Sequence, residues 1–310
     1  MIFLAAIILL PLLMIMPDTT SLYVGCSLFG ALWGIADVSI NANSLIVEKA
    51  YKRPIVTMFH AFFYMGMCFG ALISVVFLAG SIDIRIHLAI VSALLLVAFL
   101  VIRRYFLRET PSRNVHREFK IVIPKGTLLL IAFVALCGRI IEGGVADWCT
   151  VYMNEIVKLT TVFAPFGLAI YSAFISFGRF WGDTVRARYS DARVLLASCI
   201  ITVAGIAMMI SVSHIAVVII ALFICGLGLS CLVPIIYSIA GNTKGVSPGV
   251  GLATVNTISG TGFLIGPSVI GFIAEKTSLR VSFSYVLLLA LIMTWLARSY
   301  YIRSNRLSYF

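Results

Sequence analysis

Long apolar stretches, separated by short polar connections, run through almost the whole chain. A helix that crosses the hydrocarbon core of a bilayer needs about 20 mostly apolar residues. Ten stretches fit this pattern, the first of them short: 2–16, 22–47, 55–79, 86–102, 127–150, 162–180, 194–211, 215–240, 249–274 and 281–301. The first lacks the basic start and the small-residue cleavage site of a signal peptide, so we interpret it as a helix. The pattern predicts an all-α membrane protein with about ten transmembrane helices.

The composition supports this interpretation. Of the 310 residues, 61% are hydrophobic and only 11% are charged. Soluble domains carry roughly a quarter charged residues, which they need to cover their surface. A bilayer removes that need.

The basic residues are distributed unevenly between the two sides of the predicted bundle. The loops on one side hold only Arg85, Lys158, Lys276 and Arg280. The loops on the other side, together with the C-terminal end, hold most of the others: Lys49, Lys52, Arg53, Arg103, Arg104, Arg108, Arg113, Arg117, Lys120, Lys125, Arg179, Arg186, Arg188, Arg193, Lys244, Arg298, Arg303 and Arg306. Positive charge accumulates on the cytoplasmic side of membrane proteins. We therefore expect both termini in the cytoplasm, and the net charge of +11 does not indicate nucleic-acid binding.

A basic, polar segment divides the chain. Residues 103–125 form the longest connection and predict a cytoplasmic linker between a four-helix part, 1–102, and a six-helix part, 126–310. The two parts share features: LFGALWG from Leu28 resembles LFICGLG from Leu222, and glycines four apart follow in each part, at 66/70 and 262/266. Parallel repeats of this kind occur in transporters, although glycine-rich helices can also match by chance. The pairs Gly30/Gly34 and Gly66/Gly70 predict close helix packing.

A few polar side chains lie at predicted membrane depth in the first part. Ionisable groups there are costly and often functional. Asp37 and Asn41 are four residues apart and share one helix face. Asp37 has no cation within two turns of its own helix, which suits a carboxylate that gains and loses a proton, although a structural bond to another helix is the alternative. His60 titrates near neutral pH and suits proton coupling, or serves as a polar helix end.

The predicted helix 127–150 carries the richest set of polar groups. Arg139 and Glu142 are three apart and can pair on one face. Asp147 and Trp148 follow, beyond the pair Gly143-Gly144, which favours a bend. Trp148 is also compatible with an interfacial anchor, and Asp147 with a solvated position. Asn256 in a later stretch is a further candidate for a solute path.

The cytoplasmic string GRFWGDTVRARYSDAR mixes acids and bases at a helix junction. It predicts a charge network that holds the inner face in one state, although ordinary basic loop chemistry is an alternative. Its candidate gate residues are Gly178, Arg179, Gly182, Asp183, Arg186 and Arg188.

The sequence offers no sign of an enzyme. It contains no Walker motif, no HExxH, no GxSxG and no plausible catalytic triad. The seven cysteines all lie in predicted spans without a CxxC or a Cys/His cluster, as packing residues do. We expect no cofactor and no metal.

Several strings resemble the major facilitator superfamily, and in particular its fucose-permease-like branch, which includes an uncharacterised group of bacterial inner-membrane permeases. They are IADVSINANSLIVEK, FHAFFYMGMCFGA, IEGGVADWCTVYM and GRFWGD, and the resemblance covers essentially the whole chain. The last string departs from the superfamily pattern, because Arg179 stands where a glycine is usual. Against the two six-helix halves of that family, the four-plus-six division implies that this chain begins at the third helix.

The resemblance implies secondary transport by alternating access, with a small polar solute, such as a sugar, and protons as partners. It places Asp37 at a proton or substrate site and Arg139, Glu142 and Asp147 at the cavity, in a multi-pass protein of the cell inner membrane. Two alternatives stay open: a truncated remnant or regulatory membrane protein that does not transport, and a drug or metabolite exporter of the same superfamily.

Overall fold

The computed structural model describes residues 2–51, 56–105, 124–243 and 245–307. Over these ranges the regular structure is α-helix with two short 3₁₀ turns, and no strand occurs among them. The predicted linker 103–125 lies mostly outside the described residues. The prediction of an all-α protein is confirmed.

Contacts between residues group the chain into two compact units. The first unit comprises Met1–Phe59 and Val76–Arg117. It contains α1 (Ile2–Leu12), η1 (Leu13–Ile15), α2 (Thr19–Tyr51), α4 (Ile84–Ile102), η2 (Arg103–Tyr105) and both ends of α3 (Val56–Ala79). Within it, α1 packs against α2 and α4, and Phe3 contacts the rings of Trp33 and Phe99.

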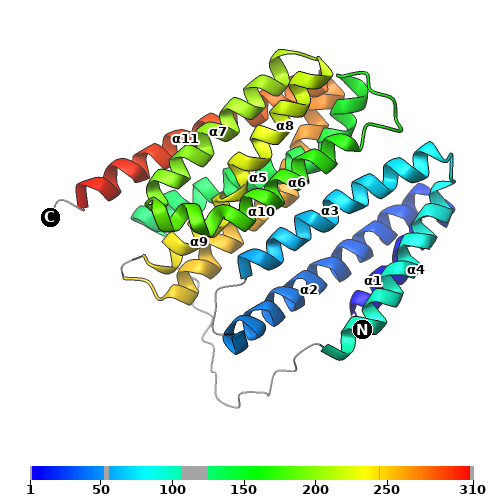
Figure 1. Ribbon diagram of the computed structural model, residues 1–310, viewed down its shortest axis with the longest axis horizontal. Helices are drawn as coiled ribbons and strands as arrows, with labels where there is room; N and C mark the ends of the chain where they lie inside the picture. Colours follow the sequence, from blue (N-terminus) through cyan, green and yellow to red (C-terminus); the bar gives the residue numbers. More distant parts are fainter. Residues whose placement is uncertain (1, 52–55, 106–123, 244, 308–310) are drawn as a thin grey trace. The chain divides into compact units, whose positions relative to one another are not determined.

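The second unit comprises His60–Val75 and Glu118–Phe310. It holds the middle of α3 with α5 (Gly126–Glu155), α6 (Phe166–Arg188), α7 (Asp191–Ser211), α8 (Ile215–Ser230), α9 (Leu232–Gly241), α10 (Pro248–Lys276) and α11 (Leu279–Leu307). Helix α5 is its central element, because it packs along both α10 and α11, while α7 packs with α8 and α11, and α6 with α8 (Figure 1). The predicted division at 103–125 stays a prediction.

Each of the ten predicted apolar stretches contains helix in the structure, and the stretch 215–240 forms two helices, α8 and α9. Within the described residues, eight spans are long and apolar enough to cross a membrane: Thr19–Glu48, Met58–Ala79, Ile84–Tyr105, Gly126–Glu155, Asp191–Ser211, Ile215–Gly241, Gly249–Lys276 and Leu279–Asn305. The first predicted stretch forms the shorter apolar helix Ile2–Ile15. Helix α6 is not one of the eight, and it carries Arg179 near its middle and Arg186 and Arg188 at its end.

Proline and glycine act differently along the spans. Pro234 lacks the N–H that would bond to Ser230 four residues earlier, and α8 ends at Ser230. A break between α8 and α9 follows, at Cys231. At Gly143-Gly144, by contrast, the helix is not interrupted, because α5 runs unbroken from Gly126 to Glu155.

Within each unit, the predicted glycine pairs do not make close helix contacts. No neighbouring helix of the same unit comes within 4 Å of a Cβ built on Gly30 or Gly34, or on Gly66 or Gly70. By contrast, a Cβ on Gly205 would lie 2.7 Å from the backbone nitrogen of Cys225. The absence of a side chain at Gly205 therefore allows α7 and α8 to touch through their backbones.

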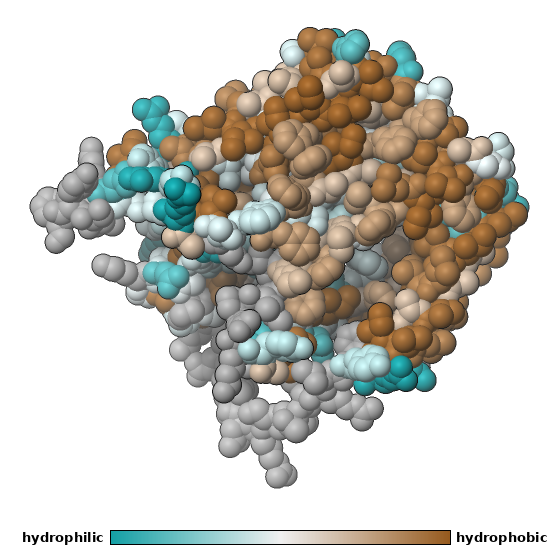
Figure 2. Space-filling model, viewed as in Figure 1, coloured by the Kyte–Doolittle hydropathy of each residue, from teal (hydrophilic) through white to brown (hydrophobic). Residues whose placement is uncertain are grey.

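Large apolar side chains are exposed on the surface of both units. Leu264, Phe272 and Trp295 are 78%, 65% and 67% exposed, and Figure 2 shows broad hydrophobic areas on the face in view. Contiguous apolar surface of this kind is unfavourable in water and matches a lipid environment. The chain is a multi-pass membrane protein.

Candidate functional site

Glu142 is the centre of a buried ionic cluster in the second unit. Its side chain accepts three hydrogen bonds: from the Tyr64 hydroxyl at 2.6 Å, from Arg179 Nη2 at 2.7 Å and from Arg139 Nη1 at 3.4 Å. Glu142 is 1% exposed. A buried carboxylate is tolerated when charged and polar donors surround it. The predicted Arg139–Glu142 pair is confirmed.

Three helices supply this cluster. Helix α5 places Arg139 and Glu142 on one face, three residues apart. Helix α6 supplies Arg179, which lies 4.5 Å over the Tyr64 ring and also donates to the backbone carbonyl of His60 at 3.4 Å. It also supplies Tyr171, whose hydroxyl donates to the backbone carbonyl of Glu142 at 3.1 Å. These hydrogen bonds and ion pairs therefore connect α3, α5 and α6.

Glycines bring α10 against the same part of α5. A Cβ on Gly266 would lie 3.1 Å from the carbonyl oxygen of Ile140, and a Cβ on Gly143 would lie 2.6 Å from Cδ1 of Phe263. The missing side chains leave room for the Phe263 ring beside Arg139, whose guanidinium carbon lies 4.8 Å from the ring centre. This cation–π contact partly replaces the lost hydration of the guanidinium.

A second polar branch leads from Arg139 to the surface of the unit. Arg139 Nη2 donates to the Tyr237 hydroxyl at 3.3 Å, and that hydroxyl donates to Oδ1 of Asn256 at 2.6 Å. Asn256 is exposed. The branch continues the buried cluster through α9 to α10, so a connected polar path runs from Arg179 to Asn256.

The cluster is not neutral. It combines two guanidinium groups with one carboxylate, and among the described side chains Glu142 is the acid that pairs with either arginine. The formal charge is therefore +1. The two arginines differ in environment: the Arg179 side chain is 3% exposed, whereas that of Arg139 is 17% exposed.

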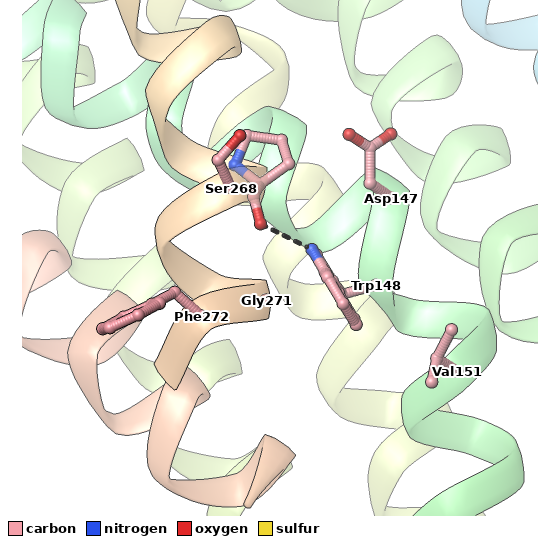
Figure 3. Close-up of a pocket in the computed structure, with 7 residues that line it drawn as sticks. Asp147, Trp148, Val151, Ser268, Gly271 and Phe272 are labelled. Carbon is pink, nitrogen blue, oxygen red and sulfur yellow. Dashed lines mark hydrogen bonds between the residues drawn. The ribbon is translucent and has the colours of Figure 1, made fainter. Parts of the chain in front are cut away.

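Asp147 and Trp148 belong to a separate pocket farther along α5. It has a volume of about 460 Å³ and is also lined by Val151 of α5 and by Pro267, Ser268, Gly271 and Phe272 of α10. The indole Nε1 of Trp148 donates to the carbonyl oxygen of Pro267 at 3.1 Å (Figure 3). Eight residues separate Arg139 from Asp147, which is about 12 Å along a helix. The structure thus divides the α5 residues between the ionic cluster and this pocket.

Of the other predicted path residues, Asp37 and Asn41 lie in the first unit, whereas His60 contacts the ionic cluster. Asp37 is on α2 in the first unit, where its side chain is exposed and has no partner among the described residues. Asn41 donates from its side chain to the backbone carbonyl of Asp37 at 3.0 Å. His60 lies at the start of the α3 segment in the second unit, and its carbonyl is one of the Arg179 acceptors.

The predicted gate residues separate into two groups. Arg179 joins the Glu142 cluster instead of the cytoplasmic junction, since α6 places it nine residues before the helix end at Arg188. Arg186 pairs with Asp191 at 3.1 Å, across the turn from α6 to α7, and Arg188 is exposed.

The glycines of the gate string pack against a neighbouring segment. Gly178 faces Ser230, and a Cβ on Gly182 would lie 3.1 Å from the sulfur of Cys231. The side chain of Asp183 lies outside the described residues.

Sequence reasoning missed the aromatic members of the site. Tyr64, Tyr171, Tyr237 and Phe263 contact the arginines or Glu142 from four different helices. Tyr64 lies in the string FHAFFYMGMCFGA, but aromatic residues in apolar helices usually pack or anchor the helix. Their residue type alone therefore does not indicate a functional site. Among the described residues, no group of three or more His, Cys, Asp or Glu could hold a metal ion.

Comparison with known proteins places the chain in a family. The sequence profile described as the Major Facilitator Superfamily matches residues 1–247 and 187–309. An uncharacterised MFS-type transporter of Yersinia pestis is 32% identical over 291 residues, which cover 94% of this chain and 75% of that protein. An uncharacterised transporter of Sinorhizobium fredii is 26% identical over 284 residues, with coverage of 91% and 74%.

A solved structure has the same fold. The E. coli fucose:proton symporter aligns with a TM-score of 0.62 at 18% identity, over 96% of this chain and 81% of the symporter. The helical bundle is therefore of the type expected from the sequence. The chain belongs to the Major Facilitator Superfamily and is a membrane transporter, not an enzyme.

Proposed function

We propose that this transporter moves a small polar solute by secondary active transport coupled to protons. The observation that carries the proposal is the polar path from Arg179 through Glu142, Arg139 and Tyr237 to Asn256, in a chain that is 61% hydrophobic. Charged groups at membrane depth are expensive and generally line a solute or ion pathway.

Alternating access is supported by how the path is held together. Ion pairs and hydrogen bonds join the α3 segment, α5 and α6, and such contacts exchange between discrete arrangements. The break between α8 and α9 adds an interruption three residues before Pro234 and six before Tyr237. Interrupted helices near binding groups are a common feature of transporters.

Asp37 is the carboxylate that we propose to carry the proton. Glu142 is already engaged by three donors, two of them cationic. The Asp37 side chain, by contrast, is exposed and has no partner among the described residues. His60, whose carbonyl contacts Arg179, is a second titratable group beside the path.

Transport by reconstituted vesicles tests the proposal. Purified protein is placed in liposomes that contain a pH-sensitive dye. Solute-dependent proton entry is then measured with four classes of solute: neutral sugars such as fucose, polyols, sugar acids, and cationic dyes. We expect at least one polar solute to drive proton entry. Asp37→Asn is expected to abolish uptake driven by a pH gradient but to leave exchange of labelled solute across the membrane.

Glu275→Gln is the matched control, because Glu275 is an exposed acid at the end of α10. Proton-driven uptake that survives Asp37→Asn contradicts the role of Asp37. Transport of dyes alone, in the outward direction, would favour an exporter, and a protein that moves none of the panel would favour the non-transporting alternative.

We further propose that the protein resides in the cell inner membrane with both ends in the cytoplasm. The concentration of Lys and Arg in alternate loops supports this orientation. A green fluorescent protein fused to the C-terminus is expected to fluoresce and a periplasmic phosphatase fused there to be inactive. The reverse pair of results would place the C-terminus outside.

A further inference from the structure

The charge of the buried cluster is unbalanced on its exposed side. Two guanidinium groups share one carboxylate, and the shorter contact, at 2.7 Å, goes to Arg179, while Arg139 lies at 3.4 Å. Glu142 therefore compensates Arg179 more fully than Arg139. The residual positive charge lies at Arg139, whose side chain is the more exposed of the two.

Arg139 also has unused hydrogen-bonding capacity. A guanidinium group has five N–H donors, and in the described structure Arg139 uses one for Glu142 and one for Tyr237. Tyr237 is neutral and brings no compensating charge. A planar guanidinium with adjacent free donors is suited to a carboxylate, which accepts two parallel hydrogen bonds.

The surroundings of Arg139 resemble a recognition site for a small organic acid. Phe263 covers one face of the guanidinium at 4.8 Å and offers an apolar wall. Asn256 accepts the Tyr237 hydroxyl through Oδ1, so its side-chain NH₂ group remains available to donate to a hydroxyl or a carboxylate. These groups lie on α5, α9 and α10 within the second unit.

We propose that the transported solute is a small hydroxylated organic acid whose carboxylate binds Arg139 and is oriented by Asn256 and Phe263. The proposal rests on the proposed function and narrows its solute from polar molecules in general to anions. The bound carboxylate brings the cluster from a formal charge of +1 to zero, which is the preferred state of charges removed from water. A neutral sugar or polyol leaves the charge of Arg139 uncompensated.

Direct binding to the purified full chain in nanodiscs tests the proposal. The probes are three matched pairs that differ by a carboxylate in place of a CH₂OH group: gluconate and sorbitol, tartrate and threitol, and lactate and propane-1,2-diol. Affinities are measured by calorimetry at constant ionic strength. We expect at least one acid to bind tenfold or more tightly than its paired alcohol, and Arg139→Gln to remove that preference.

Two variants serve as controls. Arg303→Gln removes one positive charge from an exposed position near the end of α11 and should leave the preference intact. Arg139→Lys keeps the charge without the planar fork, so it should retain part of the preference. If Arg139→Gln is recovered only as aggregate, Arg139→Lys and the selectivity of the unmodified protein still decide the question.

The possible results separate the two levels of the proposal. Binding or proton-coupled uptake of an alcohol as strong as that of its acid supports polar-solute transport but overturns the anion assignment. Failure of all three acids to bind also overturns the anion assignment. The assignment is likewise wrong if chloride binds more tightly than every acid. A preference for acids without any proton-coupled uptake retains the Arg139 site and contradicts the coupling.

Discussion

Neutralising Glu142 is expected to destabilise the protein strongly. Glu142→Gln keeps the shape of the side chain but removes the only negative charge that the described structure places between Arg139 and Arg179. The formal charge of the cluster rises from +1 to +2. The amide can still accept from the Tyr64 hydroxyl, but its NH₂ group points two donors toward cations.

The size of the effect follows from burial. Arg179 is 3% exposed and cannot regain water without opening the packing of α3 against α6. Removing one partner of a buried ion pair costs about 3–5 kcal/mol. Tyr64→Phe, which removes a single hydrogen bond to a charged acceptor, should cost about 1.5–3 kcal/mol. Arg179→Gln should cost less than Glu142→Gln, because Arg139 still compensates Glu142 and the cluster becomes formally neutral.

Unfolding of the purified protein in mixed micelles, followed by circular dichroism, measures these free energies. A double-mutant cycle with Glu142→Gln, Arg179→Gln and the combined variant isolates their coupling. We expect a coupling free energy of at least about 1 kcal/mol, since the combined variant returns to a formal charge of +1. A loss below about 1 kcal/mol for Glu142→Gln, or strict additivity in the cycle, would refute the assignment of this cluster as a buried ionic network.

Three further changes probe how the helices are joined. Gly205→Val should destabilise the protein by several kcal/mol, because its Cβ would meet the Cys225 backbone at 2.7 Å. Gly30→Val is the control and should be nearly neutral, because no atom lies within 4 Å of its Cβ position. Equal melting temperatures of the two variants would contradict this reasoning. Trp148→Phe should cost about 1 kcal/mol through the lost bond to the Pro267 carbonyl, as measured by unfolding, and no loss would be inconsistent with that bond. Pro234→Ala should join α8 and α9, raise helical dichroism and slow solute exchange in vesicles; faster exchange would argue against a role for the break.

Much of the architecture was predictable because lipid imposes a simple rule on sequence. A backbone in hydrocarbon must satisfy its own hydrogen bonds, so a long apolar stretch becomes a helix with little dependence on its neighbours. All ten predicted stretches contain helix, although 215–240 is divided into α8 and α9, and the boundaries agree closely for α3, predicted at 55–79 and observed at Val56–Ala79. Helix α6 differs more, because the predicted stretch is 162–180 whereas the helix extends to Arg188. Its last turn carries Arg186 and Arg188, and the hydrophobic pattern does not register a charged turn that continues the helix.

The candidate site was predictable only where its residues are close in sequence. Arg139 and Glu142 are three residues apart, so helical geometry alone brings them together. Arg179 is 37 residues from Glu142 and appeared, by its position in a basic string, to belong to the cytoplasmic junction. Its true partner is set by the packing of α6 beside α5, which no local pattern contains.

Glycine spacing also did not predict which helix surfaces pack closely. Gly30/Gly34 and Gly66/Gly70 have the spacing of packing motifs, yet their Cβ positions meet no atom within 4 Å, whereas Gly205 touches a backbone. Spacing states which residues share a helix face, but the identity of the opposing surface depends on the fold.

The sequence by itself determined the membrane class, the helices, the loop charge asymmetry and the one ion pair that lies within a helix turn, because each follows from hydrophobicity or from distances along a single helix. Only the tertiary structure decided that Arg179 and Tyr64 share Glu142, that Tyr237 and Phe263 face Arg139, and that Asp147 belongs to another pocket. Those relations join residues on different helices, and they are set by how side chains of unlike helices fill the space between them.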